Sequence, residues 1–267
     1  MNRLTAKGAS LDRDGTLLCC DIDLSFESGQ LVSIVGPNGA GKSSLLSLLA
    51  GDLEPATGSV DLDGVRLSSI EPIQLARRRA VLSQSNTVAF PFTVAEVVTM
   101  GRFARNAESS AATDQRIVAE AMKATDVTHL ARRRITTLSG GEAARVALAR
   151  VLAQDTSIVL LDEPTASLDI KHQEMVFELL RVKAAAGSLV IMVVHDLEAA
   201  AAISDRLILM NAGRVVVDGH PKDVLSSELL SDIYDYPLAV KVDPASGSLE
   251  VRPLRNPPVP PLNRRPS

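Results

Sequence analysis

The chain has 267 residues, of which 46% are hydrophobic and 22% charged, so it can bury the core of one large domain or two small ones. Its 28 Lys and Arg against 32 Asp and Glu give a net charge of −4, which argues against a protein that binds nucleic acid through a basic face. The longest apolar runs fall far short of the ~20 residues that cross a bilayer, and two adjacent cysteines exclude a secreted disulfide framework and suit a reducing cytoplasm.

Short apolar runs alternate with helical patterns along the chain. Residues 30–36 predict a buried strand, 41–53 a helix that stops near Gly51, and 58–67 a hairpin. From about 95 to 153 the pattern is mostly helical. The later apolar runs, SIVLL and SLVIMVV, are too continuous for half-exposed strands, so they predict parallel strands covered on both faces.

The C-terminal part of the chain predicts a further hairpin over 206–221, after which the hydrophobic pattern is lost from about Pro237. The Pro-rich end is expected to be disordered. Strands that alternate with helices predict an α/β core with a largely parallel sheet, into which the helical block from 95 to 153 is inserted.

The sequence GPNGAGKS at 36–43 fits the pattern G-x4-G-K-[ST] between a predicted strand and a predicted helix. Its glycines let backbone N–H groups turn toward phosphate oxygens, and Lys42 adds a positive charge. The hydroxyl of Ser43 is a ligand for Mg²⁺, and the N-terminus of the helix faces the anion. The motif therefore predicts nucleotide binding by Gly36, Pro37, Asn38, Gly39, Ala40, Gly41, Lys42, Ser43 and Ser44.

Three further polar groups follow predicted strands: Asp162 and Glu163 end one strand, and His195 ends another. A strand end in this sheet places Asp162 beside the phosphate loop, where it would hold Mg²⁺ through water. Glu163 is expected to point to the other side of the chain and to polarise the attacking water. Taken alone, the two acids could equally cap the turn before Pro164. His195 is expected to contact the terminal phosphate and the attacking water.

The sequence LSGGE at 138–142 is a glycine turn that opens a helix, and it provides a second helix N-terminus that can bind an anion. One nucleotide does not need two such ends so far apart in the sequence. The arrangement is explained if the second end caps the terminal phosphate of a nucleotide held by another copy of the chain. Two copies packed head to tail would then enclose two ATP molecules.

Together these motifs resemble those of the ATP-binding subunits of ABC transporters, over residues 10–236. The resemblance rests on GPNGAGKS, Gln84, LSGGE, IVLLDEP, SLD at 167–169 and His195, in that order. It implies an α/β ATPase domain at 1–236 with a P-loop NTPase core, a mainly parallel sheet, an N-terminal antiparallel β-subdomain and a helical subdomain at about 88–153. A C-terminal extension at 237–267 would follow.

The same resemblance implies ATP and Mg²⁺ at a site that closes between two copies of the chain and reopens after hydrolysis. Gln84 would contact Mg²⁺ and water and join Ser43 and Asp162 as a metal ligand. Asp169 would lie in the loop that crosses to the partner copy. The partner's nucleotide would be contacted by Ser139, Gly140, Gly141 and Glu142.

Three segments, 89–102, 168–173 and 219–240, resemble the ATPases of haem and iron-chelate importers more closely. This implies a bacterial importer, with haem favoured over a ferric siderophore or cobalamin. The implied partners are a second copy of the chain, two permease subunits and, indirectly, a periplasmic substrate-binding protein, with no nucleic acid. The chain would then lie on the cytoplasmic face of the inner membrane as a peripheral subunit.

The permease subunits are expected to dock near Phe90–Arg102. Phe90, Pro91 and Phe92 are candidates for that surface, because exposed Phe is costly without a partner to cover it. The alternative is that both Phe side chains pack within the helical insertion.

The sequence departs from the family in two places. No aromatic residue precedes the loop at the position that usually stacks on adenine, and Arg13 is the candidate to stack its guanidinium plane on the base. After LSGGE, Ala143 and Ala144 stand where most relatives carry a polar pair, which puts a cross-dimer hydrogen bond in question.

Two other functional classes remain as alternatives. A soluble ABC ATPase acting in DNA repair or translation usually carries two ATPase domains or a long coiled-coil insertion, and this sequence has neither feature. A binding module without catalysis is disfavoured by the presence of both Glu163 and His195.

Overall fold

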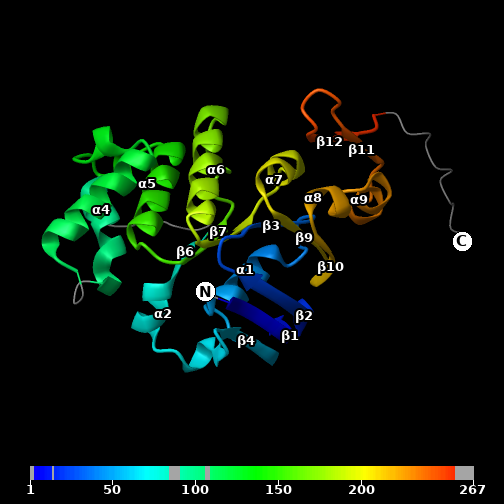
Figure 1. The fold of residues 1–267 in the computed structure, drawn as a ribbon, viewed down its shortest axis with the longest axis horizontal. Coiled ribbons are helices and arrows are strands. Elements are labelled where there is room, and N and C mark those ends of the chain that lie inside the picture. The colour runs from blue at the N-terminus through cyan, green and yellow to red at the C-terminus, as the bar shows by residue number, and fades with distance from the viewer. Residues whose placement is uncertain (1–2, 14, 84–90, 106–108, 256–267) are drawn as a thin grey trace, which may run out of the picture.

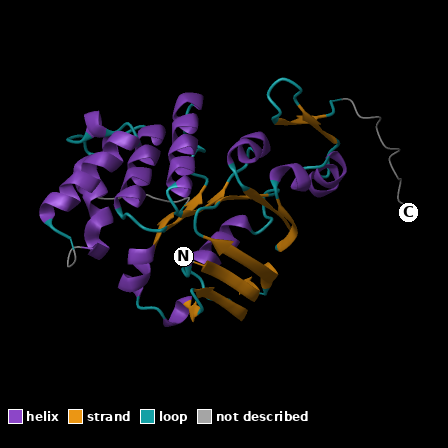
Figure 2. Ribbon diagram, in the orientation of Figure 1, coloured by secondary structure: helices purple, strands orange, loops and turns teal. Residues whose placement is uncertain are grey.

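The computed structural model of the chain describes residues 3–13, 15–83, 91–105 and 109–255. A central sheet runs across the molecule, a separate antiparallel sheet lies beside it, and the helices of residues 94–153 gather at one end (Figures 1 and 2). The predicted α/β core with an inserted helical block is therefore confirmed within the described residues.

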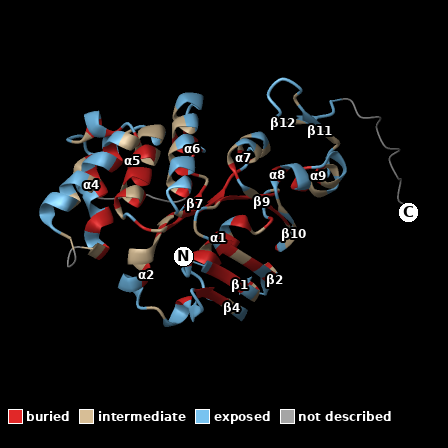
Figure 3. Cartoon of the chain, viewed as in Figure 1, coloured by how far each residue is buried: buried red, intermediate tan, exposed pale blue. Residues whose placement is uncertain are grey.

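The central sheet has six strands in the order β10-β9-β3-β8-β7-β6. They are β3 (Leu31–Val35), β6 (Arg79–Leu82), β7 (Ile158–Asp162), β8 (Leu189–Val193), β9 (Arg206–Asn211) and β10 (Arg214–Gly219). Neighbouring strands are parallel except β9 and β10, which form the predicted hairpin. Every residue of β3, β7 and β8 is buried (Figure 3), as expected for strands covered on both faces.

The second sheet is antiparallel, in the order β2-β1-β4-β5. Its strands are β1 (Arg3–Arg13), β2 (Thr16–Glu27), β4 (Thr57–Leu62) and β5 (Val65–Arg66). Asp63 and Gly64 turn β4 into β5 with φ angles of 52° and 82°, the left-handed pair that a type I′ turn needs. This sheet corresponds to the N-terminal antiparallel β-subdomain that the family resemblance implied.

Helix α1 (Lys42–Ala50) lies between the two sheets and begins directly after the phosphate loop. It ends where predicted, because Gly51 adopts a φ of 73° and donates its N–H back to the last turn. Leu45 and Leu49 of this helix join Phe26 of β2 in a core that extends to one face of the central sheet. The start of α1 is thereby fixed relative to both sheets.

The helical subdomain has a core of its own, formed by apolar residues of three helices and the segments between them. Its elements are α3 (Val94–Thr99), η2 (Met100–Arg105), α4 (Ala111–Ala124), η3 (Thr128–Leu130), η4 (Ile135–Thr137) and α5 (Gly140–Ala153). Arg102 is buried there, with Nε 2.7 Å from Oδ1 of Asp114 and Nη1 2.8 Å from the carbonyl oxygen of Ala153. These bonds fix η2 against α4 and α5.

The remaining helices complete the fold. Helices α6 (Ile170–Ala185), α7 (Leu197–Ile203), α8 (Pro221–Val224) and α9 (Ser227–Tyr234) pack in the core on the other face of the central sheet. The short elements η1 (Leu67–Ser69) and α2 (Pro72–Arg78) connect β5 to β6. Within the described ranges, none of the helices combines the length and the apolar character that a bilayer span requires.

The expectation that pattern is lost after Pro237 is wrong for residues 238–253. There β11 (Leu238–Val242) and β12 (Leu249–Pro253) form an antiparallel hairpin, and their apolar residues pack against the core beside α7. The sequence signal is the alternation in LAVKV and LEVRP, which is weak because each strand is short and only partly buried. The Pro-rich end, residues 256–267, lies outside the described residues.

A substitution at Gly101 of η2 tests how closely the helical subdomain is packed. A Cβ at this buried position would lie 2.3 Å from the carbonyl oxygen of Arg150 in α5. Gly101→Ala must push η2 away from α5, so we expect a loss of about 1–3 kcal/mol in the free energy of unfolding, measured by urea denaturation.

The matched control is Gly219→Ala, because a Cβ there would come no closer than 3.8 Å to the side chain of Val224. It should change the free energy of unfolding by less than about 0.5 kcal/mol. Equal stability of the two variants would contradict the close packing at Gly101.

Candidate functional site

The phosphate loop, residues 36–43, joins the end of β3 to the start of α1. Gly36, Gly39 and Gly41 have φ angles of 146°, 79° and 94°. A Cβ at Gly36 would lie 2.2 Å from the carbonyl oxygen of Met210, and one at Gly41 would lie 2.3 Å from that of Leu18. The loop is therefore wedged between the end of β9 and β2, and glycine is required at both positions. Of the other predicted contacts, Asn38 and Ser43 are exposed, Pro37 and Ser44 are half-buried, and Ala40 is buried.

Lys42, the first residue of α1, is buried inside the loop. Its Nζ donates to the carbonyl oxygens of Gly36 at 2.8 Å and Pro37 at 2.9 Å. Burial lowers the pKa of Lys42, whereas the negative charges of Glu163 and Asp162 act in the opposite direction. The loop thus holds one ammonium group close to both carboxylates.

Asp162 ends β7 beside the loop, as predicted, and accepts a hydrogen bond from the Ser43 hydroxyl (Oγ–Oδ1 3.1 Å). Burial raises the pKa of Asp162, although the Ser43 hydroxyl favours the charged form. Ser43 and Asp162 therefore offer two hard oxygen ligands side by side, the kind that Mg²⁺ prefers. Gln84, the third predicted ligand, lies outside the described residues.

Glu163 and His195 are in direct contact, with Nε2 of His195 2.5 Å from Oε1 of Glu163. Glu163 lies just beyond β7 with a φ of 51°, and its N–H donates to the carbonyl oxygen of Val193 at 3.1 Å. The expected alternation of strand side chains does not apply at Glu163, because a left-handed turn sets its direction. Such a conformation is strained in a residue other than glycine and is common at functional sites.

These side chains converge at one edge of the central sheet. Lys42 comes after β3, Asp162 ends β7 and His195 comes after β8, and these three strands are neighbours in the sheet. Ligands of open α/β sheets bind outside the carboxyl ends of the strands, and this edge is that location. The structure therefore brings together the lysine, the carboxylates and the histidine that the sequence predicted.

A hollow of about 340 Å³ lies next to the carboxylates, between the sheet edge and α5. It is lined by Leu82, Ser83, Gly140, Ala143, Ala144, Ala147, Asp162, Glu163, Pro164, Ala166 and Ser167. Because its walls come from both the core and the helical subdomain, a shift of one relative to the other must change its shape.

The LSGGE segment opens α5, as predicted. The N–H of Glu142 donates to Oγ of Ser139 at 3.3 Å, and the N–H of Ser139 donates to Oε2 of Glu142 at 2.8 Å, which is a reciprocal capping box. At Gly140 a Cβ would meet no other atom within 4 Å, whereas at Gly141 it would lie 3.0 Å from the carbonyl oxygen of Ser167. The end of α5 is therefore accessible at Gly140, where it can receive an anion.

Two other predicted site residues, Asp169 and Arg13, lie on other elements of the fold. Asp169 caps α6 by accepting the N–H of His172 at 2.9 Å. Arg13 is exposed at the end of β1, in the hairpin whose second strand supports the loop at Leu18. Phe90 lies outside the described residues.

Two residues that support the loop were missed by the sequence reasoning. Burial raises the pKa of Tyr234, and the N–H of Gly36, which donates to the Tyr234 oxygen, opposes that change. The thiol of Cys19 in β2 faces the carbonyl oxygen of Gly41 at 3.8 Å, and burial raises its pKa to about 12. Neither contact has a local signal, because each joins residues far apart in the sequence.

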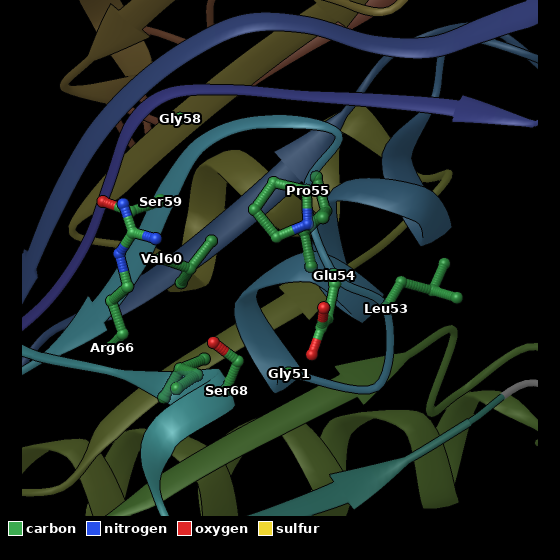
Figure 4. A pocket seen from close by; sticks show the side chains of 11 residues that line it. Gly51, Leu53, Glu54, Pro55, Gly58, Ser59, Val60, Arg66 and Ser68 are labelled. Carbon is green, nitrogen blue, oxygen red and sulfur yellow. The ribbon is translucent and has the colours of Figure 1, made fainter.

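A smaller hollow of about 120 Å³ lies at the far end of α1, against the antiparallel sheet (Figure 4). It is lined by Leu48, Gly51, Leu53, Glu54, Pro55, Gly58, Ser59, Val60, Arg66, Leu67 and Ser68. None of these is a predicted site residue, so the candidate site is the sheet edge at the other end of α1.

Comparison with known proteins supports the same location. The family model described as "ABC transporter" matches residues 19–166, which include the phosphate loop, LSGGE and both carboxylates. The "Hemin import ATP-binding protein HmuV" of Nocardia farcinica is 50% identical over 258 residues, which are 95% of this chain and 90% of that protein.

Two more distant proteins are also similar. The "Cobalamin import ATP-binding protein BtuD" of Halobacterium salinarum is 40% identical over 94% of this chain and 63% of that protein. A dimeric post-hydrolysis structure of the ATP-binding cassette MJ0796, bound to ADP and Pi, is 26% identical, with a TM-score of 0.74 over 82% of this chain and 98% of that one.

The buried charge of Asp162 predicts an effect on stability. Because burial raises the pKa of this carboxyl, its ionised form destabilises the folded chain at neutral pH. Asp162→Asn should therefore raise the Tm at pH 7 in EDTA without nucleotide. The gain should shrink as the pH falls through the folded-state pKa toward the ordinary value of 3.8, because protonated Asp162 no longer carries the charge.

The control is Asp232→Asn, which removes a carboxylate from an exposed position of α9. It should leave the Tm unchanged across the same pH range. A lower Tm for Asp162→Asn at pH 7 would mean that the ionised carboxylate stabilises the fold.

Proposed function

The chain belongs to the ABC transporter family, and we therefore propose that it hydrolyses ATP to energise a bacterial importer whose cargo is haem. The main support for the ATPase assignment is structural. At the carboxyl ends of the central strands the fold brings together Lys42, Asp162, Glu163 and His195. The cargo assignment rests on similarity to the hemin import proteins.

The loop provides the phosphate site in this proposal. Its backbone N–H groups from Asn38 to Ser44 and the N-terminus of α1 would surround the β- and γ-phosphates, while Gly36 and Pro37 shape the start of the loop. Lys42 would turn its Nζ from the carbonyl oxygens of Gly36 and Pro37 to the phosphate oxygens. Arg13, at the end of β1, is proposed to stack on the adenine.

The residues beside the loop fit Mg²⁺. Ser43 and Asp162 are adjacent oxygen ligands, and a divalent cation would relieve the cost of the buried Asp162 charge. The described residues hold no cluster of three or more His, Cys, Asp or Glu for a metal, which suits an ion that takes one or two protein ligands beside substrate phosphates. Gln84 is proposed as a further ligand. When bound, Mg²⁺ would neutralise charge on the transferred phosphate.

Glu163 is the proposed base. Its carboxylate would accept a proton from water as the water oxygen bonds to the γ-phosphorus and the bond to the β-phosphate oxygen breaks, giving ADP and phosphate. The contact of His195 with Oε1 holds this carboxylate in place, and the left-handed turn at Glu163 aims it. His195 is also the proposed contact to the γ-phosphate.

A second copy of the chain would complete the site. Ser139, Gly140, Gly141 and Glu142 at the start of α5 would cap the γ-phosphate held by the partner, and Asp169 would lie in the loop that faces it. Two observations support this: the accessible helix end at Gly140, and the dimeric cassette of MJ0796 bound to ADP and Pi.

The proposed membrane partners are two permease subunits that dock near Phe90–Arg102, on the cytoplasmic face of the inner membrane. Large apolar side chains remain exposed in this segment, with 38% of Phe92 and 40% of Met100 accessible. Phe103, the next residue after the segment, is 75% exposed. These exposures favour docking over the alternative in which Phe92 packs inside the helical insertion. A periplasmic substrate-binding protein would act indirectly.

The second candidate function is import of cobalamin or a ferric siderophore. It is favoured by the 40% identity to a cobalamin import ATPase. ATPases of such importers can be alike because the permease and the periplasmic protein contact the cargo.

The cargo assignment is tested with the chain assembled with its permease in vesicles, with a haem-binding periplasmic protein supplied. Haem should raise ATP hydrolysis several-fold, whereas cobalamin and a ferric siderophore, each supplied with its own binding protein, should not. Stimulation by either of these and not by haem would reverse the assignment.

The role of Glu163 is tested by Glu163→Gln, which keeps the shape of the side chain but cannot accept the proton. We expect ATP binding to persist and kcat to fall by about 10²–10⁴. The variant should form dimers in Mg-ATP, measured by sedimentation. Hydrolysis at the wild-type rate would remove Glu163 from the role of base.

The matched control for dimer formation is the double variant that combines Gly140→Asp with Glu163→Gln. Because a Cβ at Gly140 meets no atom within 4 Å, the new carboxylate should not disturb the fold. It would repel the phosphate of the partner's nucleotide, so this double variant should bind ATP yet stay monomeric. Dimers as strong as those of Glu163→Gln alone would contradict the shared site.

A further inference from the structure

The segment LDIKHQ at 168–173 has two residues, His172 and Gln173, that the proposed mechanism does not use. Both lie in the first turn of α6, just after Asp169. Their side chains reach back to the loop of residues 163–169, which runs from the proposed base to the proposed dimer face.

His172 lies between two carboxylates. Its Nδ1 is 2.7 Å from Oδ1 of Asp169, and its Nε2 is 3.6 Å from Oδ2 of Asp126. Asp126 belongs to the helical subdomain, in the turn between α4 and η3. The His172 side chain is 15% exposed, so the ring is held in place and spans the gap between the two parts of the molecule.

The loop itself is held at several points. Nε2 of Gln173 donates to the carbonyl oxygen of Thr165 at 3.2 Å. The N–H of Ala166 donates to the carbonyl oxygen of Glu163 at 3.3 Å, so the loop is tied directly to the base. At its other end, the carbonyl oxygen of Ser167 lies against Gly141 of α5. A displacement of Asp169 can therefore reach both Glu163 and the start of α5.

The groups around Asp169 favour its charged form. The N–H and ring of His172 lower the pKa of Asp169, and the nearby Arg145 of α5 adds to this. Asp169 is thereby kept as a carboxylate, which accepts the His172 hydrogen bond.

We propose that His172 is a positioning residue that couples the helical subdomain to the loop of residues 163–169 through Asp126 and Asp169, while Gln173 anchors that loop at Thr165. This inference rests on the proposed ATPase function. Movement of the helical subdomain would be transmitted through the imidazole to the loop, and from there to Glu163. The expected effect is on turnover, because His172 does not touch the phosphate loop.

The contact with Asp126 can be removed from either side. In His172→Asn the side-chain amide takes the place of Nδ1, so the contact with Asp169 is kept and the one with Asp126 is lost. Asp126→Gly removes the same contact and tolerates the φ of 53° at that position. In both variants Asp169 still accepts the N–H of residue 172, so the cap of α6 persists.

The experiment measures Mg-ATP hydrolysis by the full chain over a range of ATP concentrations. His172→Asn and Asp126→Gly should each lower kcat by about three- to tenfold and keep KM within about twofold. The double variant should be no slower than either single one, because both remove one contact. His172→Ala, which also loses Asp169, should be slower still.

Two controls isolate the contact. His129→Ala removes only the weak 4.0 Å pair of His129 with Asp126, and Lys171→Ala changes an exposed neighbour in the same turn of α6. Both should hydrolyse ATP like the wild type. The proposal is overturned if His172→Asn keeps the wild-type kcat, if the two single effects add in the double variant, or if His129→Ala is equally slow.

Failure of this inference is distinguishable from failure of the proposed function. Normal turnover in His172→Asn together with an inactive Glu163→Gln would reject the positioning role alone. Normal turnover in Glu163→Gln would reject the proposed mechanism itself.

Discussion

The close approach of the phosphate loop to two backbone carbonyls is the constraint on which the rest of the site depends. Met210 at the end of β9 and Leu18 in β2 leave no room for a side chain at Gly36 and Gly41. The loop is thereby held between the central sheet and the antiparallel sheet. This contact fixes Lys42 and Ser43 at the start of α1, so that Ser43 can donate to Asp162 and Lys42 feels the charges of both carboxylates.

What the sequence predicted correctly depends on local patterns. The GPNGAGKS loop, the buried strand before Asp162 and the capped helix at LSGGE are each contained in a few consecutive residues, so composition and spacing reveal them. The expected alternation at Glu163 extended the strand one residue too far, because Glu163 lies in a left-handed turn just beyond β7. The C-terminal hairpin was missed because its strands are short and only partly buried.

Contacts between distant segments could not be predicted from one sequence. The hydrogen bond of Tyr234 to Gly36 and the contact of His172 with Asp126 join different elements, and each of these residues is unremarkable in its own segment. LDIKHQ stood out only by resemblance, and the structure is needed to see that its histidine spans two parts of the molecule. The residues that perform the chemistry are thus more visible in the sequence than those that hold them in place.

The support of the loop by late parts of the chain has a consequence for biosynthesis. Residues 36–43 leave the ribosome before their supports on β9 and at Tyr234 are translated. Strand β3 lies between β8 and β9 in the sheet, and both of these strands are also translated after it. At ~5–20 residues per second, the segment that contains β3 and the phosphate loop must wait roughly 10–40 s for them. During that time its apolar strand has no neighbours in the sheet, so the nascent chain depends on chaperones or on its own antiparallel sheet to avoid aggregation.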